Sequence, residues 1–250
     1  MNTISIVNQK GGTGKTTTAI NLGASLVNLG KKVLLIDADP QANLTTGVGL
    51  IDKDKTIYDC LINDIPIKEC IYKTGIENLY IIPSSIQLAN AEIELSSVLG
   101  RESVLKDAVC SASLDYDYIL IDCNPSLGLL TVNALTVCDN VLIPLEPSIF
   151  SFQGVDNLIK IINLIRKKLN SKINIFGVLL TRVDSRTNIS KDFESQLKEI
   201  FKNKVFDTLI HQNVKIVEAQ VERKNIIEYD KQSKGAKEYL QLAKEVVKRG

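Results

Sequence analysis

Apolar residues along this chain gather into short runs that alternate with longer amphipathic stretches. The short runs are nearly continuous, as is typical of parallel strands covered on both faces. They are Ile4–Val7, Val33–Ile36, Tyr80–Ile82, Tyr118–Ile121, Val141–Ile143 and Ile175–Leu180. Helices are predicted over Thr17–Leu29, Ile86–Leu99, Glu102–Ser111, Leu127–Val137, Val155–Leu169, Ser190–Phe201 and Gly235–Val247. This alternation predicts an α/β fold, with a doubly wound, mainly parallel sheet flanked by helices.

Two helical stretches carry apolar residues at helical spacing, which predicts one buried face on each. The stripes are Leu88, Ala91, Leu95 and Val98 in the first and Tyr239, Leu240, Ala243 and Val247 in the second. We expect the second stripe to pack on the sheet. The chain has no repeat and no low-complexity linker, so we predict a single domain over residues 1–250. Because the first strand begins almost at Met1, we expect no signal peptide and no separate DNA-reading domain before it.

A glycine-rich segment separates the first predicted strand from the first predicted helix. It reads Lys10-Gly11-Gly12-Thr13-Gly14-Lys15-Thr16. Glycines in such a loop let backbone N–H groups close around phosphate oxygens, where a Cβ would block them. In this pattern the Lys15 ammonium meets the β- and γ-phosphates, and the Thr16 hydroxyl binds Mg²⁺. Strand, loop and helix together predict a phosphate cradle.

The loop departs from the ordinary phosphate-loop pattern at its start. Gln9 occupies a position where that pattern has glycine, and a second lysine, Lys10, stands at the entrance. One lysine is enough to bind a nucleotide within a single chain. The second is therefore either a solvated charge beside the phosphate site or a group with another function, and the rest of the chain has to decide between the two.

Acidic residues follow two of the predicted strands. Asp37 and Asp39 come after Val33–Ile36, and Asp122 ends the run that begins at Tyr118. In α/β sheets the working groups gather at the carboxyl ends of the strands. A hydrophobic run that ends in aspartate is a weak signal alone, but it becomes strong after a glycine-lysine-threonine loop. We therefore predict that Asp122 holds Mg²⁺ through water, as a Walker B aspartate does.

Composition restricts the possible chemistry. His211 is the only histidine, which argues against Ser-His-Asp and Cys-His catalysis and against most histidine metal sites. The five cysteines form no C-x-x-C pair, so we expect buried thiols in a reducing cytosol. No apolar stretch is long enough to span a bilayer.

Charge is distributed unevenly along the chain. Residues 1–125 hold 10 Lys and Arg against 15 Asp and Glu, a net −5, and residues 126–250 hold 20 against 14, a net +6. Such an asymmetry is a weak indication of a polyanionic partner, and a random spread of solvated charge explains it equally simply.

Three segments together resemble the ParA/Soj family of DNA-partitioning ATPases. They are Lys10–Thr17, Asp37–Asn43 and Ile121–Gly128, and the part from Asp207 to Ala236 is also similar to the last third of Soj-like proteins. The family belongs to a wider group with a deviant Walker A loop that includes MinD. The resemblance implies a P-loop NTPase fold of this type, ATP and Mg²⁺ as cofactors, and ATP hydrolysis that stays weak until a partner stimulates it.

The resemblance also implies roles for individual side chains. In this family the early lysine crosses a dimer interface to the partner's nucleotide, and Lys10 takes that position, so activity would depend on an ATP-bound homodimer. Asp39 matches the aspartate that positions the attacking water, and Asp37 matches one near the metal. The implied catalytic set is Lys10, Lys15 and Asp39, and the implied metal set is Thr16, Asp37 and Asp122.

The implied nucleotide contacts come from the loop, the Walker B aspartate and a late segment that lies near the adenine in relatives. They are Lys10, Gly11, Gly12, Thr13, Gly14, Lys15, Thr16, Thr17, Asp122, His211 and Asn213. Two departures stand out. Family members commonly have Pro-Arg-Asn where this chain has His211-Gln212-Asn213, and Pro-Pro where it has Asn124-Pro125. The first changes the base contacts and the second changes the stiffness of the switch segment; His211 itself is expected to be a surface loop residue.

Soj-like proteins bind DNA without sequence preference as ATP-bound dimers. The resemblance therefore implies double-stranded DNA and a ParB-like activator as partners, and a cytoplasmic, nucleoid-associated protein that partitions chromosome or plasmid DNA. Candidate phosphate contacts are Arg186, Lys198, Lys202, Lys204, Lys215, Arg223, Lys224, Lys231 and Lys234. About half of these are expected to be simply solvated charges on helix faces.

Three other classes use a similar scaffold. A membrane-surface regulator of the MinD type would need an amphipathic anchor after the last packed helix, and we expect the stripe that ends at Val247 to be packed instead. A nitrogenase-type iron protein would need paired cluster cysteines, whereas Cys123 is suggestive in position only. A ligase of the dethiobiotin type would need a small-molecule pocket that the sequence does not define.

Overall fold

A seven-stranded sheet forms the centre of the molecule, with the strand order β3-β4-β2-β5-β1-β6-β7. The structure is a computed structural model that describes residues 1–51, 53–148 and 151–250. The strands are β1 (Asn2–Ile6), β2 (Val33–Ala38), β3 (Tyr72–Lys73), β4 (Leu79–Ile82), β5 (Tyr118–Cys123), β6 (Asn140–Leu145) and β7 (Asn174–Leu180). Every neighbouring pair is parallel except β3 with β4. The predicted mainly parallel sheet is confirmed, and β3 is an edge strand that the pattern did not predict.

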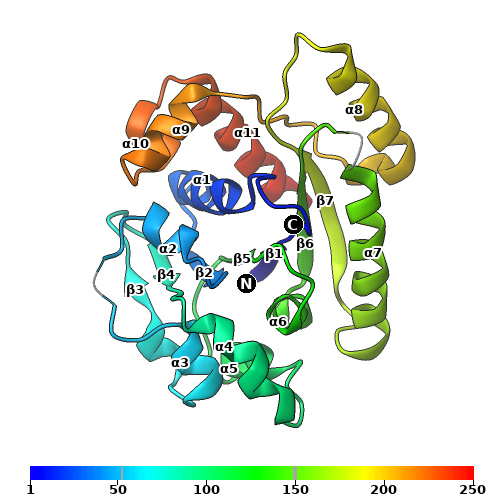
Figure 1. The fold of residues 1–250 in the computed structure, drawn as a ribbon. Helices are drawn as coiled ribbons and strands as arrows, with labels where there is room; N and C mark the ends of the chain where they lie inside the picture. The colour runs from blue at the N-terminus through cyan, green and yellow to red at the C-terminus, as the bar shows by residue number, and fades with distance from the viewer. Residues whose placement is uncertain (52, 149–150) are drawn as a thin grey trace.

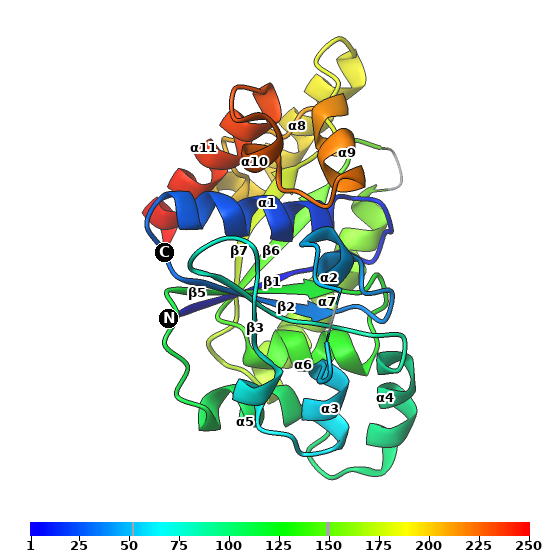
Figure 2. The ribbon, with the colours of Figure 1, turned by 90° about the vertical axis from the view of Figure 1, so that its left-hand side faces the viewer.

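Helices cover both faces of the sheet (Figures 1 and 2). They are α1 (Lys15–Asn28), α2 (Asn43–Gly47), α3 (Ile57–Ile62), α4 (Leu88–Glu94), α5 (Val104–Ser111), α6 (Leu129–Val137), α7 (Ser151–Lys168), α8 (Asn188–Phe201), α9 (Val214–Val221), α10 (Ile226–Asp230) and α11 (Lys234–Arg249). Helix α1 lies on one face with α9, α10 and α11 beyond it, and α3 to α6 lie on the other. Side chains of β2 alternate between the two cores, with Leu35 facing α1 and Leu34 facing away from it. Burial on both faces explains why the strand sequences read as continuous apolar runs.

The predicted helix over Ile86–Leu99 is too long. Helix α4 ends at Glu94, a short 3₁₀ turn covers Leu95–Ser97, and Val98 is extended and 43% exposed. The hydroxyl of Ser96 donates a hydrogen bond to the carbonyl of Ile93, and such local bonds compete with continuation of a helix. Leu88, Ala91 and Leu95 are buried as predicted, whereas Val98 does not belong to that face.

The apolar stripe near the end of the chain packs mainly on helix α1, in the core that this helix shares with one face of the sheet. Helix α11 buries Tyr239, Leu242, Ala243 and Val246 and contacts α1 along its length. The reason is that α1 already covers this face of the sheet, so α11 forms an outer layer (Figure 2). The apolar face of α11 is therefore occupied and is not a free membrane anchor. Among the described residues, no helix is long and apolar enough to cross a bilayer.

Strand register places the acidic residues together. Strand β5 lies between β1 and β2, and Asp122 on β5 is the register partner of Asp37 on β2 and of Ile6 on β1. Side chains of register partners point to the same face of a sheet. Both aspartates therefore point toward the face covered by α1, beside the loop that leaves β1.

Candidate functional site

The loop between β1 and α1 has the backbone geometry of a phosphate cradle. Gly12 and Gly14 adopt left-handed conformations, with φ of 76° and 84°, which residues with a Cβ rarely adopt. Gly14 is the residue that precedes α1, so the unpaired N–H groups of the first helical turn face the mouth of the loop. The hydroxyl of Thr181, just after β7, donates to the carbonyl of Thr13 at 2.8 Å. The segment after the edge strand β7 thus anchors the loop.

The two lysines of the loop occupy different environments. The side chain of Lys15 is buried, and its Nζ donates to the carbonyl of Lys10 at 3.4 Å. Burial lowers the pKa of Lys15, and the charge of Asp122 opposes this in part. Lys10 is exposed, and its Nζ lies 3.3 Å from Ser148 Oγ and 3.8 Å from Glu146 Oε2. Lys10 is not among the described residues that line the adjacent cavity.

Asp37 is held firmly by the segment that follows β2. One oxygen accepts bonds from the Thr45 amide at 2.8 Å and the Thr45 hydroxyl at 2.6 Å, and the other accepts from the Asp39 amide at 3.2 Å. Burial raises the pKa of Asp37 to about 6, although these hydrogen bonds act in the opposite direction. Both oxygens are engaged, so Asp37 positions α2 and the segment around Asp39.

Asp122 has the opposite character. It is 1% exposed, and neither carboxylate oxygen accepts a hydrogen bond from any described residue. Burial, followed by the charge of Asp37, raises the pKa of Asp122 well above its usual range, while the nearby Thr16 hydroxyl and Lys15 ammonium oppose the shift. An unsatisfied buried carboxylate is costly, and a hard divalent cation is the partner that would satisfy it. The residues at this point therefore fit Mg²⁺, with Thr16 and Asp122 as its holders.

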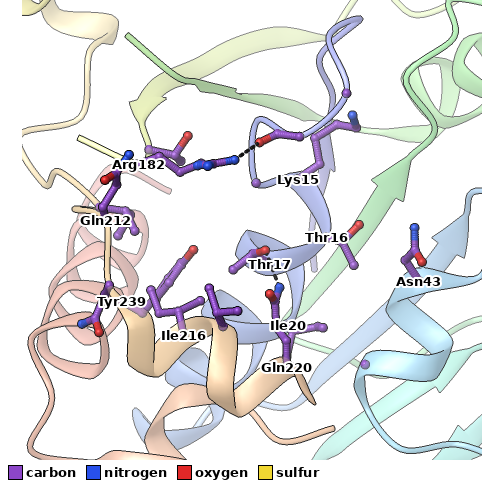
Figure 3. Close-up of a pocket in the computed structure, with 18 of the residues that line it drawn as sticks. Lys15, Thr16, Thr17, Ile20, Asn43, Arg182, Gln212, Ile216, Gln220 and Tyr239 are labelled. Atoms are coloured by element: carbon purple, nitrogen blue, oxygen red, sulfur yellow. Dashed lines mark hydrogen bonds between the residues drawn. The ribbon is translucent and has the colours of Figure 1, made fainter. Parts of the chain in front are cut away.

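A cavity of about 860 Å³ opens beside the loop (Figure 3). Its polar end is formed by the loop and by Thr16, Thr17 and Asp39, and its apolar end by Ile216 and Tyr239. An amide of Gln220 on α9 donates to the Thr17 hydroxyl at 2.7 Å and closes one side. The volume lies within the range of small-molecule sites, and its two ends suit a phosphate chain and an apolar base.

His211 and Asn213 line the same cavity. Nδ1 of His211 lies 2.6 Å from Glu238 Oε1, and its backbone N–H donates to Glu238 Oε2 at 3.0 Å. His211 is partly exposed and lies in the segment before α9, and a carboxylate of α11 holds its ring at the cavity wall. Asn213 caps α9 through a bond from the Lys215 amide.

A family model described as an AAA domain matches residues 1–175. The sporulation initiation inhibitor protein Soj of Bacillus subtilis is 48% identical over 249 residues, covering 99% of this chain and 98% of that protein. The chromosome partitioning protein ParA of Myxococcus xanthus is 45% identical, covering 98% and 88%. The chain belongs to the ParA/Soj family. Among solved structures, cobyrinic acid a,c-diamide synthase of Mycobacterium smegmatis with bound ADP and magnesium has a TM-score of 0.86 and 32% identity, covering 99% and 94%.

The fold of this ParA/Soj-family chain brings most of the predicted nucleotide-site residues together. Gly11, Gly12, Gly14 and Lys15–Thr17 line the cavity, and Asp122 lies buried behind the loop. Three further predicted residues do not line the cavity. Lys10 lies near Glu146, and Asp37 is hydrogen-bonded to Thr45. Thr13 is buried, and its carbonyl accepts the bond from Thr181.

The nine predicted DNA contacts are spread over the C-terminal part of the chain, from Arg186 to Lys234. Five of them form ion pairs with nearby acids: Arg186 with Asp184, Lys198 with Glu194, Lys215 with Glu218, Lys224 with Glu222 and Lys234 with Glu238. Paired cations are still able to contact DNA phosphates after exchanging partners, so the set stays a prediction.

Sequence reasoning missed three kinds of functional residue. Arg182 lines the cavity from the end of β7, and Gln220 bridges α9 to α1. Asn124, one of the two departures from the family pattern, accepts a bond from the Thr131 hydroxyl at 2.8 Å and so ties the switch segment to α6. Each of these residues acts through a contact between segments that are not neighbours in the predicted motifs, and a pattern of local spacing does not indicate such contacts.

Replacing Thr45 by valine is expected to destabilise the fold by about 2–3 kcal/mol. The Thr45 hydroxyl donates to Asp37 and accepts from the Ser84 amide at 2.9 Å, so valine of the same shape would leave the buried Ser84 amide without its acceptor. It would also remove one of the two hydrogen bonds that Thr45 makes to that oxygen of Asp37. Urea unfolding of the nucleotide-free chain measures the effect. The exposed neighbour Thr46 provides the control, since Thr46→Val is expected to change the free energy of unfolding by less than about 0.5 kcal/mol. Equal values for the two variants would show that this network does not hold α2.

Proposed function

We propose that this chain is an ATPase switch that binds ATP and Mg²⁺, dimerises with ATP, binds DNA without sequence preference, and partitions chromosome or plasmid DNA. The observation that carries the proposal is the placement of Lys10. It stands at the entrance of the phosphate loop, is exposed, and does not line its own chain's cavity. A cation placed there is available to the nucleotide of a second copy. Membership of a family that contains Soj and ParA supports the same conclusion.

Within one chain, the residues divide the work of hydrolysis. The loop N–H groups and Lys15 bind the phosphates, and Thr16 and Asp122 hold Mg²⁺, which supplies charge neutralisation at the phosphates. Asp39 lines the cavity and is 8% exposed. Its Oδ1 accepts a bond from the Gln41 amide at 2.9 Å, which fixes its direction. A carboxylate beside an anionic phosphate is a poor base. Asp39 therefore orients the attacking water more than it deprotonates it.

Dimerisation would bring a further positive charge to each nucleotide site. Lys10 of each copy then adds a positive charge near the other's γ-phosphate, where negative charge develops during transfer. The two basic C-terminal halves, each with a net charge of +6 over residues 126–250, come together in such a dimer. Binding to DNA phosphates strengthens when several weak contacts act at once. A ParB-like activator would stimulate hydrolysis and release the dimer from the nucleoid.

The Lys10→Ala variant tests this proposal. We expect it to bind a non-hydrolysable ATP analogue within about twofold of the native affinity, since Lys10 lies outside its own cavity. The dimer and the retention of DNA with the analogue should both be lost. Light scattering after gel filtration and a DNA-binding assay at several salt concentrations measure the two effects.

A matched control is Lys68→Ala, which removes another exposed lysine far from the loop and should leave both properties unchanged. A Lys10→Ala chain that still dimerises and retains DNA with the analogue would refute the switch. If the native chain retains DNA equally with ADP and with the analogue, the bound nucleotide does not control DNA binding.

A further inference from the structure

One carboxylate lies between two cations at the mouth of the nucleotide cavity. Glu146 directly follows β6. Its Oε2 is 3.8 Å from Lys10 Nζ, and its Oε1 is 3.5 Å from Arg182 Nε. These are loose ion pairs between partly exposed side chains, and such pairs exchange partners at little cost. Glu146 therefore holds both cations weakly.

Arg182 has an unusual backbone conformation. Its φ is 53°, in the left-handed region that few residues other than glycine adopt. The preceding residue, Thr181, holds this turn in place by donating its amide to the Leu145 carbonyl at 2.8 Å and its hydroxyl to the Thr13 carbonyl at 2.8 Å. Strained conformations of this kind persist where the surroundings determine them, and they gather at functional sites.

The guanidinium of Arg182 reaches across the cavity toward the phosphate loop (Figure 3). One terminal nitrogen lies 3.5 Å from the Gly12 carbonyl, which is too long for a strong hydrogen bond. Arg182 lines the cavity, whereas Lys10 does not. A guanidinium is the side chain best suited to bind phosphate oxygens with two donors, and Gly11, Gly12 and Gly14 of the loop line the same cavity as Arg182.

We propose that Arg182 is a second cationic contact for the phosphates of the nucleotide bound in its own chain. Glu146 is the carboxylate that occupies Arg182 and Lys10 until phosphates replace it. The Arg182 contact rests on nucleotide binding in this cavity, and the release of Lys10 rests on the proposed dimer. A phosphate chain competes with Glu146 for Arg182 because it offers more negative charge at the same place.

Equilibrium binding of a non-hydrolysable ATP analogue with Mg²⁺, compared with adenosine, tests the Arg182 contact. Arg182→Asn, whose side chain tolerates the left-handed region, should weaken binding of the analogue about tenfold and leave adenosine binding unchanged. Arg182→Lys should recover part of the loss. Glu146→Gln should strengthen binding of the analogue about threefold, because it removes the competing carboxylate.

Arg101→Gln is the matched control, because Arg101 also pairs with a carboxylate, Glu102, in a part of the chain outside the cavity. It should change neither affinity. Unchanged analogue affinity in Arg182→Asn would overturn the proposal. An equal weakening of adenosine binding would also overturn it, since it would assign Arg182 to the base instead of the phosphates.

Repeating the measurement in the Lys10→Ala chain separates this proposal from the dimer. The effect of Arg182→Asn should persist there, and its disappearance would show that Arg182 acts only through a partner. The second part of the proposal is the release of Lys10 from Glu146. It predicts that Glu146→Gln dimerises with the analogue at about threefold lower protein concentration. An unchanged dimer threshold would overturn that part and leave the Arg182 result as it stands.

Discussion

Replacing Lys15 by methionine is expected to remove the response of this chain to MgATP. Lys15 is buried behind the loop, beside Asp122, and it is the only loop lysine directed into its own chain's site among the described residues. A ligand at a hundredfold excess over its Kd stabilises the native chain by about 2.7 kcal/mol, and the variant should show less than about 0.5 kcal/mol under the same conditions. Loss of one positioned charge at a reacting phosphate should lower kcat/KM for hydrolysis by roughly 10²–10³-fold.

Thermal unfolding with and without MgATP measures the first effect, and phosphate release measures the second. Lys53→Met is a matched control, since burial also lowers the pKa of Lys53 but its ammonium donates to the Ser84 carbonyl outside the cavity. That variant should keep the response to MgATP. A Lys15→Met chain that is stabilised as much as the native chain would show that the loop is not the phosphate site.

The parts of the site that could be predicted depend on residues that lie close together in the sequence. The phosphate loop needs two left-handed glycines and a lysine at fixed spacing, and Gly12, Gly14 and Lys15 meet that need at the predicted place. Asp37 and Asp122 come together because each ends an apolar run, and parallel strands present their carboxyl ends at one edge. Local spacing and strand direction were sufficient for both.

The parts that could not be predicted depend on contacts between distant segments. Glu146 and Arg182 lie just after strands β6 and β7, carry no motif, and come together only because those strands are neighbours. The family resemblance places His211 near the base, but its partner Glu238, 27 residues later, is one that no local pattern indicates. Short helices such as α2 and α10, of five residues each, show too few turns for periodicity to reveal them.

The two buried aspartates of the site differ in how their oxygens are satisfied, and this difference makes the ligand-free fold less stable. Asp37 satisfies its oxygens with Thr45 and Asp39, whereas Asp122 satisfies neither of its own within the described chain. Buried carboxylates with raised pKa values favour the protonated form. The nucleotide-free fold thus carries a cost at neutral pH that a bound cation removes.

Replacing Asp122 by asparagine is therefore expected to stabilise the nucleotide-free chain at pH 8, by roughly 2–4 kcal/mol, while abolishing Mg²⁺-dependent hydrolysis. A carboxyl whose pKa is raised on folding contributes its stability below the pKa of the unfolded chain and loses it as pH rises through the folded pKa. Because folding raises the pKa of Asp122, the folded chain keeps this proton to higher pH than the unfolded chain does, so the gain from asparagine should be smaller at pH 4 than at pH 8. The raised pKa of Asp37, about 6, adds a decline between pH 4 and 7 that both chains share.

Urea unfolding at pH 4 and pH 8, each with and without Mg²⁺ and ATP, measures the free energy of unfolding of the native chain and of Asp122→Asn. Mg²⁺ with ATP should stabilise the native chain at pH 8 by more than it stabilises Asp122→Asn, because only the native chain has a carboxylate to neutralise. Asp107→Asn changes an exposed carboxyl on α5 and should alter stability by less than about 0.5 kcal/mol at either pH. A variant that is less stable than the native chain at pH 8, or equally stabilised at both pH values, would mean that Asp122 is not held as an uncompensated charge, and the case for it as a metal holder would lose its physical basis.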